Sequence, residues 1–159
     1  MGDTAVSTLV ALPAERLSDV RELYRLLDPA LPTVERATAD AALGAAGVTV
    51  LAAVAPDERI AGLVTLVVVP TLARTRAWAE DLVVHPEFRG RGVGKALMAA
   101  CAEAAACAGA ESIDGTVDPS REAALTLYLG AGWEVSRSLP VRLDLAAGRA
   151  RSRSAGTNR

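Results

Sequence analysis

The sequence predicts a mixed α/β fold, in which helices cover both faces of one twisted, mostly antiparallel sheet. Two observations support this prediction. Three apolar, β-branched runs follow one another before the longest helical segment, which is typical of an antiparallel meander. After that segment, strand patterns alternate with helical patterns, as they do in mixed sheets. The length of 159 residues suits a single domain, which we place at residues 1–145.

The N-terminal region predicts two helices. Pro13 can open the first helix, and Asp28-Pro29 ends it. A second helix, with a weaker pattern, is predicted from Thr33 as N-cap to Gly47 as C-terminal cap. The apolar residues of the first helix recur at helical spacing and are Leu17, Val20, Leu23, Tyr24 and Leu27.

The middle of the chain predicts the meander. Residues 48–54 and 60–69 are apolar and flank the turn sequence Pro56-Asp57-Glu58, so they form a hairpin. Residues 70–76 are a polar, basic connection. A third strand over residues 77–84 ends at His85-Pro86, because a residue before proline favours extended geometry.

The C-terminal half predicts two helices and two strands. An alanine-rich helix over residues 93–108 is stopped by Gly109. A strand over 112–117 and a helix over 121–129 follow. A last strand is expected to include Val141, Leu143 and Leu145, and residues 146–159, with arginines among Gly, Ser and Ala, are expected to be disordered.

Composition excludes several classes of partner. Lys+Arg 17 against Asp+Glu 19 gives a net charge of −2, so neither nucleic acid nor an anionic membrane is expected to bind, despite the arginines near the C-terminus. The apolar stretch 60–69 is too short to span a bilayer. Cys101 and Cys107, six residues apart on one helix, cannot bridge, which suits a soluble, cytoplasmic protein. Whether the chain forms a homodimer stays open.

A basic, glycine-rich turn joins the third strand to the alanine-rich helix. The first N–H groups of that helix lack intrahelical partners and carry the positive end of the helix dipole, so they can bind phosphate oxygens. The glycines remove side chains that would keep a phosphate off the backbone. The segment reads Arg89, Gly90, Arg91, Gly92, Val93, Gly94 and Lys95.

Two other phosphate-binding motifs do not fit this turn. A P-loop needs four residues between its glycines and Ser or Thr after the lysine, whereas Gly90 and Gly94 enclose three and Ala96 follows Lys95. A dinucleotide fingerprint needs glycine where Lys95 stands. The nucleoside triphosphatase and dinucleotide-binding hypotheses therefore fail.

The turn resembles the signature of the GNAT superfamily of acetyl-CoA-dependent N-acetyltransferases, which is Arg or Gln, two residues, Gly, one residue, then Gly or Ala. Here Arg89, Gly92 and Gly94 occupy those positions. Residues 80–84 look like the family's fourth strand, and residues 121–128 with Gly132-Trp133 look like its closing helix and strand. These pieces follow one another in the family's order and cover about half the chain.

The resemblance implies where acetyl-CoA would bind. The turn from Arg89 to Lys95 would hold the pyrophosphate, and Leu82, Val83 and Val84 would contact the pantetheine arm between two splayed strands. A backbone N–H near Leu82 would face the thioester oxygen. Many members carry Asn where this chain has Arg121, which leaves the cofactor contact of Arg121 open.

The chemistry needs a proton donor and a base. Tyr128 is the candidate acid, since a phenol keeps its proton at neutral pH and can give it to a thiolate. Glu80 is the candidate base if strand alternation places it on the side of Leu82. A strand bulge would reverse that parity and favour Asp81, and water is a third alternative.

Other mechanisms are disfavoured. His85 is the single histidine, so neither a Ser-His-Asp triad nor a metal site of several histidines can be assembled, and no metal is expected. Acyl-enzyme formation at Cys101 or Cys107 is disfavoured, because cysteines on alanine-rich helices are usually small core residues. We therefore expect direct acetyl transfer from acetyl-CoA to a primary amine of a small molecule or peptide, with a non-catalytic acyl-CoA-binding sensor as the alternative.

Overall fold

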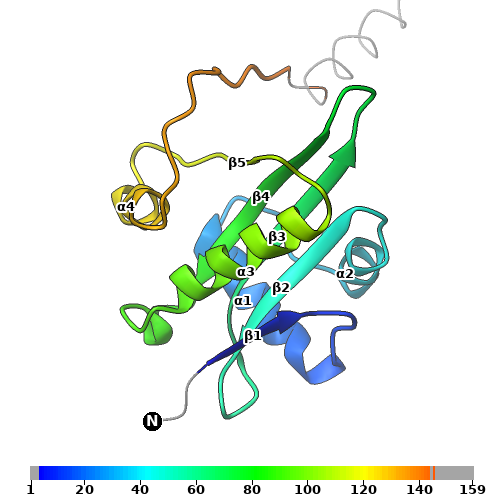
Figure 1. Ribbon diagram of the computed structural model, residues 1–159. Coiled ribbons are helices and arrows are strands. Elements are labelled where there is room, and N and C mark those ends of the chain that lie inside the picture. The colour runs from blue at the N-terminus through cyan, green and yellow to red at the C-terminus, as the bar shows by residue number, and fades with distance from the viewer. Residues whose placement is uncertain (1–3, 144, 146–159) are drawn as a thin grey trace, which may run out of the picture.

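The computed structural model describes residues 4–143 and 145, and an open, five-stranded sheet forms its centre (Figure 1). The strand order follows the sequence, and all neighbours are antiparallel except β4 and β5, which are parallel. The mixed, mostly antiparallel sheet predicted from the sequence is confirmed. The strands are β1 (Ala5–Thr8), β2 (Val48–Val54), β3 (Ile60–Pro70), β4 (Thr75–Val84) and β5 (Ile113–Gly115).

Helices cover both faces of this sheet, as predicted. α3 (Val93–Cys107) packs on one face, and α1 (Leu17–Leu27) with α2 (Arg36–Leu43) covers the other. α4 (Glu122–Gly130) packs beside the start of α3, and two 3₁₀ turns, Ala14–Arg16 and Pro86–Phe88, precede α1 and α3. None of the helices in the described part of the chain is long and apolar enough to cross a membrane.

Side chains of the central strands alternate between two cores. Ala53 and Val64 belong to the core under α3, which also contains Leu97 and Cys101. Their neighbours Ala52 and Leu63 belong to the core under α1. Since successive strand residues point to opposite faces, two apolar cores explain why β2 and β3 are apolar throughout.

The N-terminal predictions need three corrections. The sequence analysis missed β1, which is short and lies at the sheet edge. α2 begins at Arg36 with Glu35 as N-cap, not Thr33, because the Val34 carbonyl is held at 2.8 Å by the Arg21 guanidinium on α1. α2 ends at Leu43 with Gly44 as its C-cap, not Gly47. Gly47, with φ +77°, leads into β2, and a Cβ at Gly47 would clash with the Val68 carbonyl.

The ends of the later strands also differ from the predictions. β4 starts at Thr75, so the connection is limited to residues 71–74, and β5 is shorter than the predicted strand 112–117. The last strand does not form in the described residues: Val141 is 96% exposed, and Leu143 and Leu145 are exposed as well. Residue 133 likewise starts no strand. The disorder expected for 146–159 lies outside the described residues.

Candidate active site at the bulge of β4

A β-bulge in β4 positions the candidate residues. Leu63 pairs with Val83 and Thr65 with Glu80, so the single residue between them on β3 lies opposite two residues of β4, Asp81 and Leu82. Asp81 has φ +57°, a left-handed conformation that aspartate tolerates better than most residues. After the bulge, each later residue of β4 therefore points to the face of the sheet opposite to the one that strict alternation would give.

This shift corrects the expected orientation of Glu80. Ala79 lies in the core under α3, so Glu80 points to the α1 face, whereas Leu82 packs against the α3 core. The expectation that Glu80 and Leu82 share a face is wrong, because the bulge lies between them. Asp81 also faces α1, since its Oδ2 accepts a 2.9 Å hydrogen bond from the Tyr24 hydroxyl. The carboxylates of the consecutive residues Glu80 and Asp81 therefore both point to the α1 face of the sheet.

Burial and the nearby Asp81 carboxylate raise the pKa values of Glu80 and Tyr24. The pKa of Glu80 is raised, first by burial and then by the negative charge of Asp81. The pKa of Tyr24 lies well above its usual range, first because the ring is buried and then because Asp81 is close. A carboxyl with a raised pKa is a better proton acceptor than an exposed one.

From residue 80 onward, β4 no longer pairs with its parallel neighbour β5. β4 and β5 pair only at Ala77 with Ile113, Trp78 with Asp114 and Ala79 with Gly115. In the described residues, β4 from position 80 to 84 therefore has no strand on its β5 side. We call this segment the free edge of β4, and it contains the three predicted pantetheine contacts, Leu82, Val83 and Val84.

The glycine turn lies between the free edge and α3. Gly90 and Gly92 have φ +70° and +80°, and a Cβ at either position would meet no atom within 4 Å. The first ladder hydrogen bond of α3 runs from the Ala96 N–H to the Gly92 carbonyl at 3.0 Å, so the preceding amides are not used by the helix. The turn is therefore open in front of unpaired N–H groups, which is the arrangement that an anion requires.

Basic side chains surround this turn. Arg89 is exposed and donates from Nε to the Val84 carbonyl at 3.0 Å, which ties the turn to the free edge. Arg91 lies with its guanidinium 5.7 Å from the centre of the Phe88 ring, and Lys95 is exposed on the first turn of α3.

Two residues of the turn also serve packing. Val93 is buried in the core under α3. A Cβ at Gly94 would lie 2.8 Å from a methyl carbon of Leu127, so this glycine permits α4 to pack closely on α3.

Tyr128 lies at the end of β5. Its ring is buried and packs edge-on against Trp133, with centroids 4.9 Å apart. A Cβ at Gly115 would lie 3.4 Å from the Tyr128 hydroxyl oxygen, so the hydroxyl lies over the last residue of β5. Within the described residues this hydroxyl forms no hydrogen bond, and the residue is 7% exposed.

The surroundings keep Tyr128 protonated. Its pKa is raised, first by burial and then by the nearby Cys101 and Glu80. Arg121, the N-cap residue of α4, is exposed and acts in the opposite direction, lowering this pKa. A protonated phenol whose oxygen has no hydrogen-bond partner among the described residues can donate to a bound ligand.

The single histidine and the two cysteines lie in surroundings that do not suggest a catalytic role. His85 follows β4 directly, accepts the Glu87 N–H at Nδ1 and lies 3.5 Å from the Glu22 carboxylate. Cys101 is buried, which raises the pKa of its thiol to about 11 and makes it a poor nucleophile. Cys107 is exposed, contrary to the expectation of a core residue.

Sequence reasoning missed the role of Tyr24. It was identified only as part of the apolar stripe of the first helix. Its hydroxyl contacts a residue 57 positions away, and a local pattern carries no information about such a contact. The one available signal was that Tyr24 is the polar member of an otherwise apolar stripe.

Comparison with known proteins identifies the family of this chain. The model of the acetyltransferase (GNAT) family matches residues 17–133, and the chain therefore belongs to the GNAT acetyltransferase family. A search of curated proteins gives no match.

Solved structures share the fold. A putative acetyltransferase from Agrobacterium tumefaciens superposes with a TM-score of 0.75 at 24% identity, covering 87% of this chain and 99% of that one. An acetyltransferase from Trypanosoma brucei gives 0.73 at 28% identity, covering 90% and 100%. An aminoglycoside N-acetyltransferase, AAC(6′)-Iy, solved with CoA, gives 0.72 at 19% identity, covering 91% and 97%.

Proposed function

We propose that this protein transfers the acetyl group of acetyl-CoA directly to a primary amine of a small molecule or peptide. One observation carries the proposal: the free edge of β4 begins beside the Ala79–Gly115 pair, where the Tyr128 hydroxyl lies, and ends at Val84, whose side chain is next to Gly94 of the glycine turn. The CoA bound to the structural relative AAC(6′)-Iy supports the choice of cosubstrate.

Each part has a role in binding acetyl-CoA. Amides at the start of α3, beside Gly92, bind the pyrophosphate with help from Arg91 and Lys95. The free edge of β4 pairs with the amide groups of the pantetheine arm, as an added strand would. A bulge leaves a backbone N–H outside the ladder, and in this proposal the amide near Leu82 stabilises the oxyanion that forms from the thioester carbonyl.

Two protons move during the acetyl transfer: one leaves the amine and one reaches the departing thiolate. A carbon–nitrogen bond forms as the neutral amine attacks the thioester carbon, and the carbon–sulfur bond breaks when the tetrahedral intermediate collapses. Tyr128 gives its proton to the departing thiolate, and the carboxylates of Glu80 and Asp81 take the amine proton, directly or through water. Tyr128 then regains a proton from solvent.

The first experiment measures acetyl-CoA binding by thermal unfolding. Millimolar acetyl-CoA and CoA should both raise Tm, because a ligand that binds only the native state stabilises it, whereas acetate should not. An unchanged Tm overturns the proposal. Thiol release that depends on an added amine then distinguishes the enzyme from a non-catalytic acyl-CoA sensor, which would bind acetyl-CoA without turnover.

A further inference from the structure

An apolar cavity of about 290 Å³ lies on the α1 face of the sheet. We call it the inner cavity. Nine of its twelve lining residues are apolar, and they come from segments far apart in the sequence, including Leu12, Leu43, Val50 and Leu63. The three polar residues in the lining are Tyr24, Thr38 and Asp81. The cavity therefore joins an apolar chamber to the carboxylate at the bulge of β4.

The bulge carboxylates have no cation to balance them. In residues 4–143, neither Glu80 nor Asp81 forms an ion pair. The one hydrogen bond to Asp81 comes from the Tyr24 hydroxyl, which is neutral. Partly buried negative charge without a positive partner is unfavourable, so this end of the cavity favours a bound cation.

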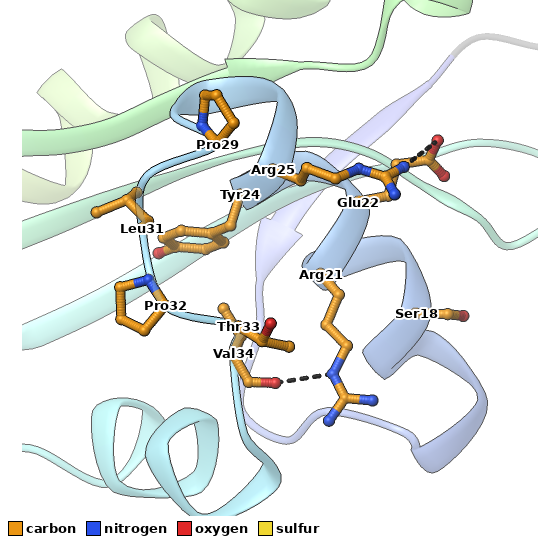
Figure 2. Close-up of a pocket in the computed structure, with 10 residues that line it drawn as sticks. All are labelled: Ser18, Arg21, Glu22, Tyr24, Arg25, Pro29, Leu31, Pro32, Thr33 and Val34. Atoms are coloured by element: carbon orange, nitrogen blue, oxygen red, sulfur yellow. Dashed lines mark hydrogen bonds and ion pairs between the residues drawn. The ribbon is translucent and has the colours of Figure 1, made fainter.

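The arginines closest along α1 are already engaged. An outer cavity of about 460 Å³ shares Tyr24 and Val34 with the inner cavity and is lined by residues of α1 and the segment 29–34 (Figure 2). There Arg21 donates to the Val34 carbonyl at 2.8 Å, and Arg25 pairs with Glu22 on the side away from Tyr24. These two arginines therefore do not neutralise Asp81, and the ammonium group of a bound ligand can do so.

We propose that the acceptor is a small amine with an apolar body, which places its ammonium at Asp81 and its body in the inner cavity. This inference rests on the proposed acetyl transfer and names the acceptor class for it. Asp81 and Leu82 are consecutive residues of the free edge, so an amine bound at Asp81 lies next to the backbone at which we place the thioester. Tyr24 acts as a positioning residue, because its hydrogen bond fixes the Asp81 carboxylate.

The cavity also selects by size and polarity. A volume of about 290 Å³ lies at the lower end of the range for ligand sites. An aminoglycoside would bring many hydroxyl groups against apolar walls, where they would lose their hydrogen bonds to water. The acceptor class thus differs from that of the structural relative AAC(6′)-Iy, although the fold is shared.

Substrate competition tests the class. We expect kcat/KM for 2-phenylethylamine to exceed that for kanamycin and spermidine by about 100-fold or more, since neither polar amine can use the apolar walls. If acetyl-CoA raises Tm and kanamycin is the better substrate, this inference is overturned while acetyl transfer stands. If acetyl-CoA does not bind, the proposed function itself fails.

Two matched helix variants test the cavity. Ala41 and Ala42 are both exposed residues of α2, but only Ala42 lines the inner cavity. Ala42→Leu should raise KM for 2-phenylethylamine about 10-fold and leave KM for acetyl-CoA unchanged, because the added carbons fill the chamber. Ala41→Leu should change neither constant. Equal effects of the two variants would place the acceptor elsewhere.

A binding measurement tests the charge without any turnover. Calorimetry should show 2-phenylethylamine binding at neutral pH at least about 10-fold more tightly than 2-phenylethanol, and Asp81→Asn should remove that preference. The alcohol serves as the probe for folding of the variant, because it should bind Asp81→Asn as it binds the original chain. A preference for the amine that survives Asp81→Asn would overturn the assignment.

Discussion

One tyrosine lies on each face of the sheet, and the two differ in the hydrogen bonding of their hydroxyl groups. Tyr128, beside the α3 face, has a hydroxyl that lies over Gly115 and forms no hydrogen bond within the described residues. Tyr24, on the α1 face, donates its hydroxyl to Asp81 at 2.9 Å. A free hydroxyl can move a proton, whereas an engaged one fixes a neighbour. In the proposed mechanism, the proton donor Tyr128 and the acceptor site at Asp81 therefore lie on opposite faces of one strand, β4.

The largest expected effect breaks or confirms this division. Tyr128→Phe should lower kcat by roughly 100-fold or more, the usual cost of losing a general acid, while Tm and acetyl-CoA affinity stay nearly constant. Tyr24→Phe is the matched control on the other face. It should act mainly on KM for the amine, because it releases Asp81 and removes no proton donor. Full kcat in Tyr128→Phe would leave solvent as the proton source.

A smaller effect concerns the α3 side alone. Gly92→Val should weaken acetyl-CoA binding by about 10-fold or more, because a side chain would stand where the pyrophosphate meets the backbone. Gly109 lies just past the other end of α3 with the same φ of +80° and the same open surroundings, so Gly109→Val carries an equal strain. Comparing Tm and acetyl-CoA Kd for both variants separates strain from cofactor contact. Equal Kd values would remove the turn from the binding site.

The smallest effect concerns the carboxylates on the α1 face. The folded chain holds the pKa of Glu80 above its unfolded value, so stability is lost as pH rises through the unfolded and then the folded pKa. Glu80→Gln should therefore raise Tm slightly at pH 7, with the gain disappearing near the ordinary carboxyl pKa of about 4.3. The exposed Glu103 on α3 provides the control Glu103→Gln. A gain that persists at low pH would contradict burial as the cause.

The α3 side could be predicted from the sequence because its features are local. The glycine turn, the helix it opens and the stop at Gly109 lie in one continuous segment, and helix-end chemistry depends on neighbouring residues. The meander was predictable for the same reason, since apolar runs and the Pro56-Asp57-Glu58 turn are adjacent.

The α1 face was not predictable, because distant segments form it. The bulge at Asp81 was foreseen only as an alternative, since no residue type marks it in the sequence. The contact between Tyr24 and Asp81 and the inner cavity depend on how α1 and α2 pack on the sheet. The expected strand at Val141 and Leu143 failed for a related reason: alternating apolar residues favour a strand but do not provide a neighbour to pair with.

The short pairing of β4 with β5 bears on the order in which the chain folds. The antiparallel strands β2, β3 and β4 are joined by short turns, whereas β4 and β5 meet only after α3 has been placed between them, and they share just three residue pairs. Contacts between distant segments form later and are the first to open. Amides of residues 113–115 should therefore exchange with deuterium before those of β3. Opening at this point would carry Tyr128 away from β4 while the meander stays intact, so that activity would decline at temperatures where most of the protein remains folded.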